Sequence, residues 1–187
     1  MSRYHHKSID LVRSPDFSFK FEVPNFDGGQ RVNLHKRAEI VRESIEVPLA
    51  PENKAEALER LALVYEMVPS LKGQLPTYYI GWMGIFELVA HALDARGLGK
   101  SHKPVQIKEK FGSLRWYTVT DSREEFDIIE WGTSLSDVVC SRYGTMDGSI
   151  VSPNGWYLVL GERAQKEIAE AKTDKWQKDF YARFGDL

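Results

Sequence analysis

Apolar residues recur at three- and four-residue steps in two stretches of the chain, a spacing that places them on one face of a helix. The first stretch predicts a helix at about residues 52–68, with acidic side chains and Arg60 on the opposite, polar side. Its apolar positions are Leu58, Leu61, Tyr65 and Val68. The second stretch predicts a helix at about 82–96, which ends because Gly97 readily takes the conformation that stops a helix. Its shared face carries Trp82, Ile85, Phe86, Val89 and Leu93.

Between residues 105 and 119 the hydrophobic period changes to two, as in half-buried strands. In VQIKEKFGSLRWYTV, Ile107 alternates with polar neighbours on the way out, and Leu114 and Trp116 do so on the return. Gly112 can take the positive φ that a tight reversal needs. The pattern predicts an antiparallel hairpin.

A third helix is predicted at about 123–139, and a capping box marks its start. Two pairs could form this box, Asp121 with Glu124 or Ser122 with Glu125. Gly132 inside the helix is about 1 kcal/mol less favourable than alanine, so we expect a close packing contact there.

The last part of the chain predicts turns at 141–155, a short strand at 156–160 and a charged helix at about 162–183. Together the elements predict an α+β fold, in which amphipathic helices pack on a small antiparallel sheet centred on the hairpin 105–119. We expect an α+β core at 76–187. An N-terminal extension at 1–75 would carry a strand at 17–23, which shows period-two alternation, and the helix at about 52–68.

The chain has 187 residues and a formal net charge of −2, a length that suits one domain with an extension. Such a net charge argues against electrostatic binding of DNA or RNA by the protein surface as a whole, although a local basic patch is compatible with it. The single cysteine, Cys140, excludes an internal disulfide. Because no signal peptide or membrane-spanning stretch is evident, we expect a cytoplasmic protein without a membrane partner.

The most specific motif is KEKFGSLRWY at 108–117. It follows a helix that opens with the Gly-Trp pair at 81–82, and it precedes a helix ending in SDVVC, a glycine-rich turn and a second Gly-Trp pair at 155–156. In this order the motifs resemble a group of small uncharacterised proteins of phage and bacterial genomes. Their shared core is a Gly-Trp helix, a KEKFGGLRFY-like hairpin and a C-terminal zinc-ribbon-like knuckle. The resemblance covers roughly residues 80–165 and implies a knuckle at 140–164.

The zinc ligands that this resemblance implies are mostly missing. The corresponding positions hold Cys140, Tyr143, Gly161 and Ala164. A structural zinc usually needs four Cys or His ligands, and one is left. We therefore expect no bound metal and no cofactor, with Cys140 a vestigial ligand position. The knuckle would instead be held by the packing of Tyr143, Trp156 and Tyr157.

Candidate catalytic groups are few. The sequence GLGKS at 97–101 lacks the first glycine of a phosphate-binding loop and follows a helix, so it predicts a helix end. Cys140 could act as a nucleophile only beside a histidine, for which His91 and His102 are the candidates. The carboxylate pairs are Glu124 with Glu125 and Glu109 with Asp121. An enzyme that uses Cys140 or a carboxylate pair stays open as an alternative.

The favoured hypothesis is a non-enzymatic protein of phage or mobile-element type that binds and blocks another macromolecule, such as a host-defence inhibitor (an anti-CRISPR) or a toxin immunity protein. It rests on analogy with the genomes that carry the resembling proteins. The slightly acidic net charge suits a protein partner with a basic face. Aromatic and Arg side chains dominate interface energetics, which points to the hairpin. The expected contact residues are Lys108, Lys110, Phe111, Arg115 and Trp116.

Two alternatives concern the same residues. Phe111 and Trp116 could simply be core residues of the sheet. The hairpin could also bind nucleic acid, with its basic side chains on phosphates and aromatic rings on bases. The residues for this are Lys103, Lys108, Lys110, Arg115, Trp116 and Tyr117. The oligomeric state is left open.

Overall fold

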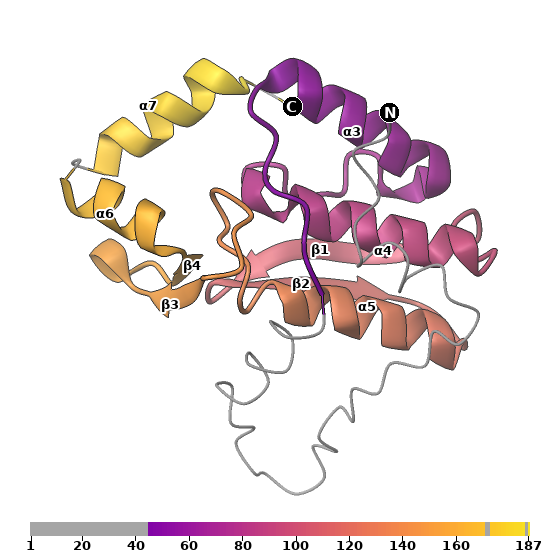
Figure 1. The fold of residues 1–187 in the computed structure, drawn as a ribbon. Helices are drawn as coiled ribbons and strands as arrows, with labels where there is room; N and C mark the ends of the chain where they lie inside the picture. The colour runs from indigo at the N-terminus through magenta and orange to yellow at the C-terminus, as the bar shows by residue number, and fades with distance from the viewer. Residues whose placement is uncertain (1–44, 171–172, 186) are drawn as a thin grey trace, which may run out of the picture.

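A computed structural model describes residues 45–170, 173–185 and 187 of the chain. Within them, helices and two small antiparallel sheets confirm the predicted α+β fold (Figure 1). The helices are α3 (Lys54–Met67), α4 (Met83–Ala95), α5 (Arg123–Leu135), α6 (Glu162–Glu170) and α7 (Thr173–Arg183), and the strands are β1 (Pro104–Lys110), β2 (Ser113–Thr118), β3 (Ser149–Val151) and β4 (Leu158–Leu160). Short 3-10 turns lie at Pro69–Leu71, Ile80–Trp82 and Pro153–Gly155. The predicted strand at 17–23 lies outside the described residues.

Helix α4 is the centre of the core, because it packs against α3 on one side and α5 on the other (Figure 1). Its sequence is apolar on nearly all sides, as expected for a helix between two neighbours. Gly132 of α5 makes the close contact that its position predicts. A Cβ atom there would lie 2.2 Å from Cγ2 of Val89. Helix α4 ends as predicted, with Gly97 at a φ of 69°.

Helix α3 buries a face that only partly matches the predicted one, because Leu61 and Val68 are buried as expected, whereas Arg60, expected on the polar side, is buried as well. Its buried residues are Ala57, Arg60, Leu61 and Val64, whereas Leu58 is 47% exposed. The apolar core runs without interruption from Ile45 through α3 to α4 and the hairpin. Residues on both sides of the predicted boundary at 75 and 76 share this one core within the described part of the chain.

The predicted hairpin is confirmed as β1 and β2, which pair antiparallel around Phe111 and Gly112. Its inner face is apolar, and the ring of Trp116 lies 6.5 Å from that of Phe86 on α4. The end of α5 meets β2, because the Leu114 N–H donates to Oγ of Ser136 at 2.9 Å. The helix layer thus covers one face of the hairpin and leaves the other to solvent.

The region after α5 departs from the prediction in two places. Residues 149–151, expected to be turns, form β3 and pair with β4. The single helix expected at 162–183 is replaced by α6 and α7, which run in different directions (Figure 1). Helix α7 turns back toward α3, and Phe180 and Phe184 pack against the main core.

Candidate functional site

The turn of the hairpin places an aromatic side chain in an unusual backbone conformation. Phe111 has a φ of 56° and Gly112 a φ of 83°. A left-handed residue costs an L-amino acid about 1–2 kcal/mol, and glycine or asparagine would take this position more readily. The carboxylate of Glu109 holds the turn, because its Oε1 accepts from the Gly112 N–H at 2.6 Å. Despite the strain, the Phe111 side chain is 63% exposed.

One more exposed aromatic ring, that of Tyr157, lies against Phe111, and Trp156 precedes Tyr157 in the chain. We call Phe111, Trp156 and Tyr157 the tip aromatics. Trp156 is 70% exposed and Tyr157 is 48% exposed. The rings of Phe111 and Tyr157 meet edge to face with their centroids 6.2 Å apart. Gly112 permits this approach, since a Cβ there would lie only 3.3 Å from the backbone of Tyr157. Large apolar groups gathered on a surface in this way mark an interaction site.

Next to the tip aromatics, the solvent face of the hairpin is basic. Side chains alternate along a strand, so Lys108 and Lys110 share this face with Arg115 and Tyr117. We call Lys108, Lys110 and Arg115 the basic face. The Nζ of Lys110 lies 5.3 Å from the ring centroid of Phe111, and that of Lys108 lies 5.7 Å from the ring of Tyr117. Cations and aromatic rings are therefore interleaved along the strands.

Trp116, the fifth residue expected at the contact surface, has no part in it. It is 5% exposed and lies on the inner face of β2, between the sheet and the helices. The core alternative therefore holds for Trp116 but not for Phe111. Because alternate residues of a strand point to opposite faces, the sequence already places Trp116 on the face opposite to Arg115 and Tyr117. The alternation could therefore have excluded Trp116 from the predicted contact residues.

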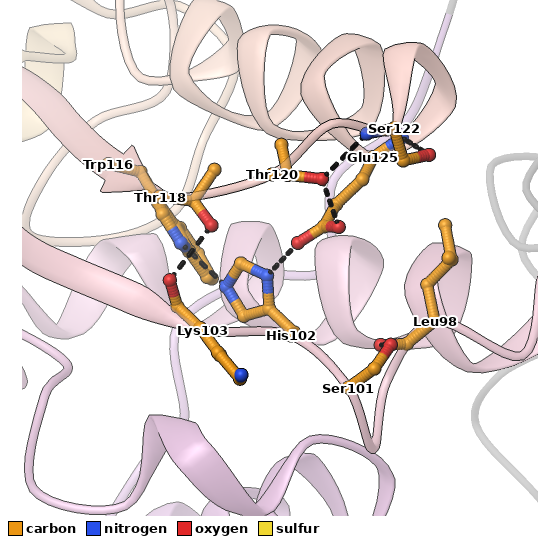
Figure 2. A network of polar contacts seen from close by, with 9 residues as sticks. All are labelled: Leu98, Ser101, His102, Lys103, Trp116, Thr118, Thr120, Ser122 and Glu125. Carbon is orange, nitrogen blue, oxygen red and sulfur yellow. Dashed lines mark hydrogen bonds and ion pairs between the residues drawn. The ribbon is translucent and has the colours of Figure 1, made fainter.

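Trp116 belongs instead to a buried polar network around His102 (Figure 2). The Trp116 indole donates from Nε1 to Nε2 of His102 at 3.1 Å. On the other side of the ring, Nδ1 lies 2.6 Å from Oε1 of Glu125. Oγ1 of Thr120 donates to Oε2 of Glu125 at 2.6 Å, and the Ser122 N–H donates to the same Thr120 oxygen.

This network fixes the tautomer of His102. Because Nε2 accepts from Trp116, the ring proton is on Nδ1, where it is donated to Glu125. Both nitrogens of the neutral ring are thus used. The His102 side chain is also fully buried. A general base needs a free lone pair within reach of a substrate, so the geometry assigns His102 a structural role.

Glu125 shows how the capping box is used. Ser122 is the N-cap of α5, and its Oγ accepts from the Glu125 N–H at 3.2 Å. The Glu125 side chain, however, turns inward to His102. Its neighbour Glu124 pairs with Arg96 at 3.3 Å. The two carboxylates therefore serve different partners, and they do not form an acid–base pair.

Cys140 is fully buried in a small apolar cluster near the C-terminal end of α5. It lies far from both candidate histidines. His102 bonds to Glu125, which lies in the first turn of α5. The end of α5 nearest to Cys140 comes ten residues later, which is about 15 Å of helix. Gly81, just before α4, lies against the backbone of Cys140, since a Cβ on it would touch the Cys140 carbonyl. His91 follows Gly81 by ten residues, so it lies about 15 Å further along. Neither histidine can activate the thiol.

The positions that the resemblance assigns to zinc ligands do converge in space. Cys140 and Ala164 share the small cluster with Leu158 and Leu160, and Tyr143 packs against it. Among the described residues, no group of three or more His, Cys, Asp or Glu side chains could hold a metal ion. The expected packing role is confirmed for Tyr143. It is wrong for Trp156 and Tyr157, which face solvent.

Tyr143 also anchors α6 through a charged cluster. Its hydroxyl donates to Oε2 of Glu167, and the guanidinium of Arg163 lies 4.2 Å from its ring centroid. Arg142 pairs with the same carboxylate at 3.2 Å. Burial raises the pKa of Tyr143, and the bond to Glu167 adds to this. Burial also acts to raise the pKa of Glu167, but Tyr143 and the two arginines outweigh it and hold that pKa below its usual value.

Comparison of the chain with protein-family models, curated proteins and solved structures finds no match. The resemblance to phage and bacterial proteins therefore stays a prediction. Within the described residues, no helix combines the length and apolar character that crossing a membrane requires.

Sequence reasoning missed one buried ion pair, between Arg60 on α3 and Glu87 on α4. Arg60 is 8% exposed and Glu87 is 2% exposed. The Arg60 guanidinium donates to the Glu87 carboxylate from Nε and from Nη2, the latter at 2.7 Å. Its Nη1 donates to the Leu49 carbonyl at 2.8 Å. The available signal was Glu87 itself, a single acidic residue in the apolar run MGIFELVAHAL. Such a charge is buried only with a partner.

A cleft of about 1570 Å³ lies between the segment before α3, the loop 141–146 and α7. Its walls mix acidic and basic side chains. The cations Arg142 and Arg163 on its wall are held by Glu167 and Tyr143. The cleft therefore lacks the uniform charge that distinguishes the basic face.

Proposed function

We propose that this protein acts by binding another macromolecule through the tip aromatics and the basic face, and that it blocks this partner without a chemical step. The observation that supports the proposal most directly is the conformation of Phe111. A strained and exposed aromatic residue is unfavourable for the fold in two ways at once. Backbone strain of this kind persists mainly where the side chain has a functional role.

The composition of the surface supports the same proposal. Aromatic and Arg side chains supply most of the binding energy in protein interfaces, and Phe111, Trp156 and Arg115 are of this kind. The buried His102 network supports it indirectly, because its hydrogen bonds tie the inner side of the hairpin to α5. A rigid hairpin presents its tip in one conformation, which lowers the entropy lost on binding.

The positive charge of the hairpin changes the expected charge of the partner's surface. The net charge of the whole chain favours a partner with a basic face, whereas the basic face of the hairpin requires an acidic one. An inhibitor of a host-defence complex or an immunity protein against a toxin fits the proposal if the blocked protein has an acidic surface around an apolar pocket. Phe111 would be the residue that enters this pocket.

Affinity capture from a host lysate tests the proposal, with tagged wild type compared with the variant Phe111→Asn. Asparagine accepts the left-handed backbone, so the variant should fold at least as well. We expect a stoichiometric partner with the wild type and its loss with the variant. The matched control is Tyr181→Ser, which removes a ring that is 57% exposed on α7. Equal capture by wild type and Phe111→Asn would refute the proposal, as would the absence of any protein or nucleic acid captured in a stoichiometric amount.

A further inference from the structure

We infer that the partner of the basic face and the tip aromatics is a single-stranded nucleic acid. The inference rests on the proposed function, since it names the partner class of that same surface. It depends on two observations that are independent of each other, the unpaired cations of the hairpin and the exposure of its rings.

The cations of the hairpin gather on one face without acidic side chains to neutralise them. None of Lys108, Lys110 and Arg115, nor Lys103 at the open end, forms an ion pair with a carboxylate of the described residues. Arg96, in contrast, pairs with Glu124. The one acidic residue within β1, Glu109, is turned to the inner side, where it accepts from the Gly112 N–H and from the Tyr79 hydroxyl at 3.3 Å.

The kind of cation helps to choose between acidic partners. Three of these four cations are lysines, a residue depleted in protein–protein interfaces. Phosphate groups, in contrast, are contacted by lysine and arginine alike, and each contact releases counter-ions from the nucleic acid. A chain with a net charge of −2 that keeps such a cluster unpaired on one hairpin face favours a polyanion as the partner.

The exposed aromatic rings favour single-stranded over double-stranded nucleic acid. Tyr117, 47% exposed, lies on the same face as the lysines, and the tip aromatics continue the row. Exposed rings bind nucleic acid by stacking on bases, and a base has a free face only when it is not stacked within a duplex. Cations alternating with rings along an open sheet face therefore match the phosphates and unstacked bases of a single strand.

The test is fluorescence anisotropy of labelled (dT)20 and (rU)20 with the full chain, titrated between 50 and 200 mM NaCl. With three to four phosphate contacts, affinity for a single strand should fall about 20- to 50-fold over this range. Phe111→Asn and Trp156→Ser should each weaken binding about 5- to 150-fold through lost stacking. Lys108→Glu should weaken it and flatten the salt dependence. Lys178→Glu, an exposed lysine of α7, is the matched control and should leave binding unchanged.

Each other outcome overturns the inference. No binding of either oligonucleotide at 50 mM NaCl would do so, as would equal affinity for a duplex of the same length. Displacement of the oligonucleotide by poly-L-glutamate at equal charge concentration would point to an acidic protein instead. Affinity unchanged by Phe111→Asn, with unchanged thermal unfolding, would remove the stacking role. If a protein partner is captured in a Phe111-dependent manner while (dT)20 fails to bind, the inference fails and the proposed function stands.

Discussion

The buried pair between Arg60 and Glu87 allows a sharp prediction about what holds α3 against α4. The perturbation is to replace each residue separately by an apolar residue of similar size, Arg60→Met and Glu87→Leu, and then both together. Each single change leaves the other charge in a site with almost no access to water, since Glu87 is 2% exposed and Arg60 is 8% exposed. The double change leaves neither charge.

The expected magnitudes follow from this geometry. Breaking a buried pair from one side typically costs about 3–5 kcal/mol, whereas replacing the whole pair by apolar groups is often close to neutral. Arg60 also donates to the Leu49 carbonyl, and losing that bond adds about 1 kcal/mol to any variant without the guanidinium. We therefore expect each single variant to lose about 3–5 kcal/mol and the double variant to lose no more than about 1–2 kcal/mol.

Urea unfolding followed by circular dichroism measures these differences. The single variants should also show a melting temperature lower by roughly 6–20 °C, given the size of the chain. The exposed pair of Arg123 with Asp127 provides the control, and Arg123→Met should change stability by no more than about 0.5 kcal/mol. If the losses of the two single variants add up in the double variant, the side chains are not coupled and the reasoning is refuted.

Three further predictions concern the hairpin, its buried network and α6. Phe111→Asn should leave the free energy of unfolding unchanged or raise it by up to about 1 kcal/mol, because it relieves backbone strain; a loss above about 1 kcal/mol in urea unfolding would make the ring structural. His102→Phe should lose about 2–4 kcal/mol, since it leaves Glu125 and the Trp116 indole without their buried partner, and hydrogen exchange of the hairpin amides should report it. Glu167→Gln should make acid unfolding less steep. The folded pKa of Glu167 lies below the reference value of 4.5, so its contribution is present above that pH and is lost as the pH falls through the folded pKa. The melting temperature, measured from pH 6 to about 3, should fall less in Glu167→Gln than in the wild type. An equal fall in both proteins would show that the cluster does not contribute to stability.

Most of the fold could be predicted because its signals are local. Hydrophobic periods of two and of about 3.6 placed the hairpin, α4 and α5 within a few residues of their observed bounds. Gly132 and Gly97 could be interpreted correctly because a helix tolerates glycine poorly, which leaves packing or termination as the reason for it. Each of these inferences uses information from a stretch shorter than twenty residues.

The errors lie where a distant partner decides the outcome. A periodicity argument ranks Arg60 as polar and Leu58 as apolar, and it therefore rotates α3 away from its true orientation. Arg60 is buried with a partner, Glu87 on the next helix, which lies 27 residues away in the sequence. Residues 149–151 form a strand only because β4 is there to pair with them. The candidate site shows the same limit, since Tyr157 reaches the hairpin tip only through the fold.

The region 140–164 is held together by apolar packing and by hydrogen bonds. Cys140 and Ala164 meet in a buried apolar cluster. Backbone bonds hold the loop that follows α5, since the Cys140 N–H donates to the Thr145 carbonyl at 2.7 Å and the Ser141 N–H donates to the Val159 carbonyl at 2.9 Å. Asp147 then fixes the start of α6 by accepting from the Glu162 N–H at 2.9 Å. Because these bonds tie β4 to the loop, they also help to place Tyr157, just before this strand, against Phe111. The loop thus takes part in the proposed function by positioning one of the three tip aromatics.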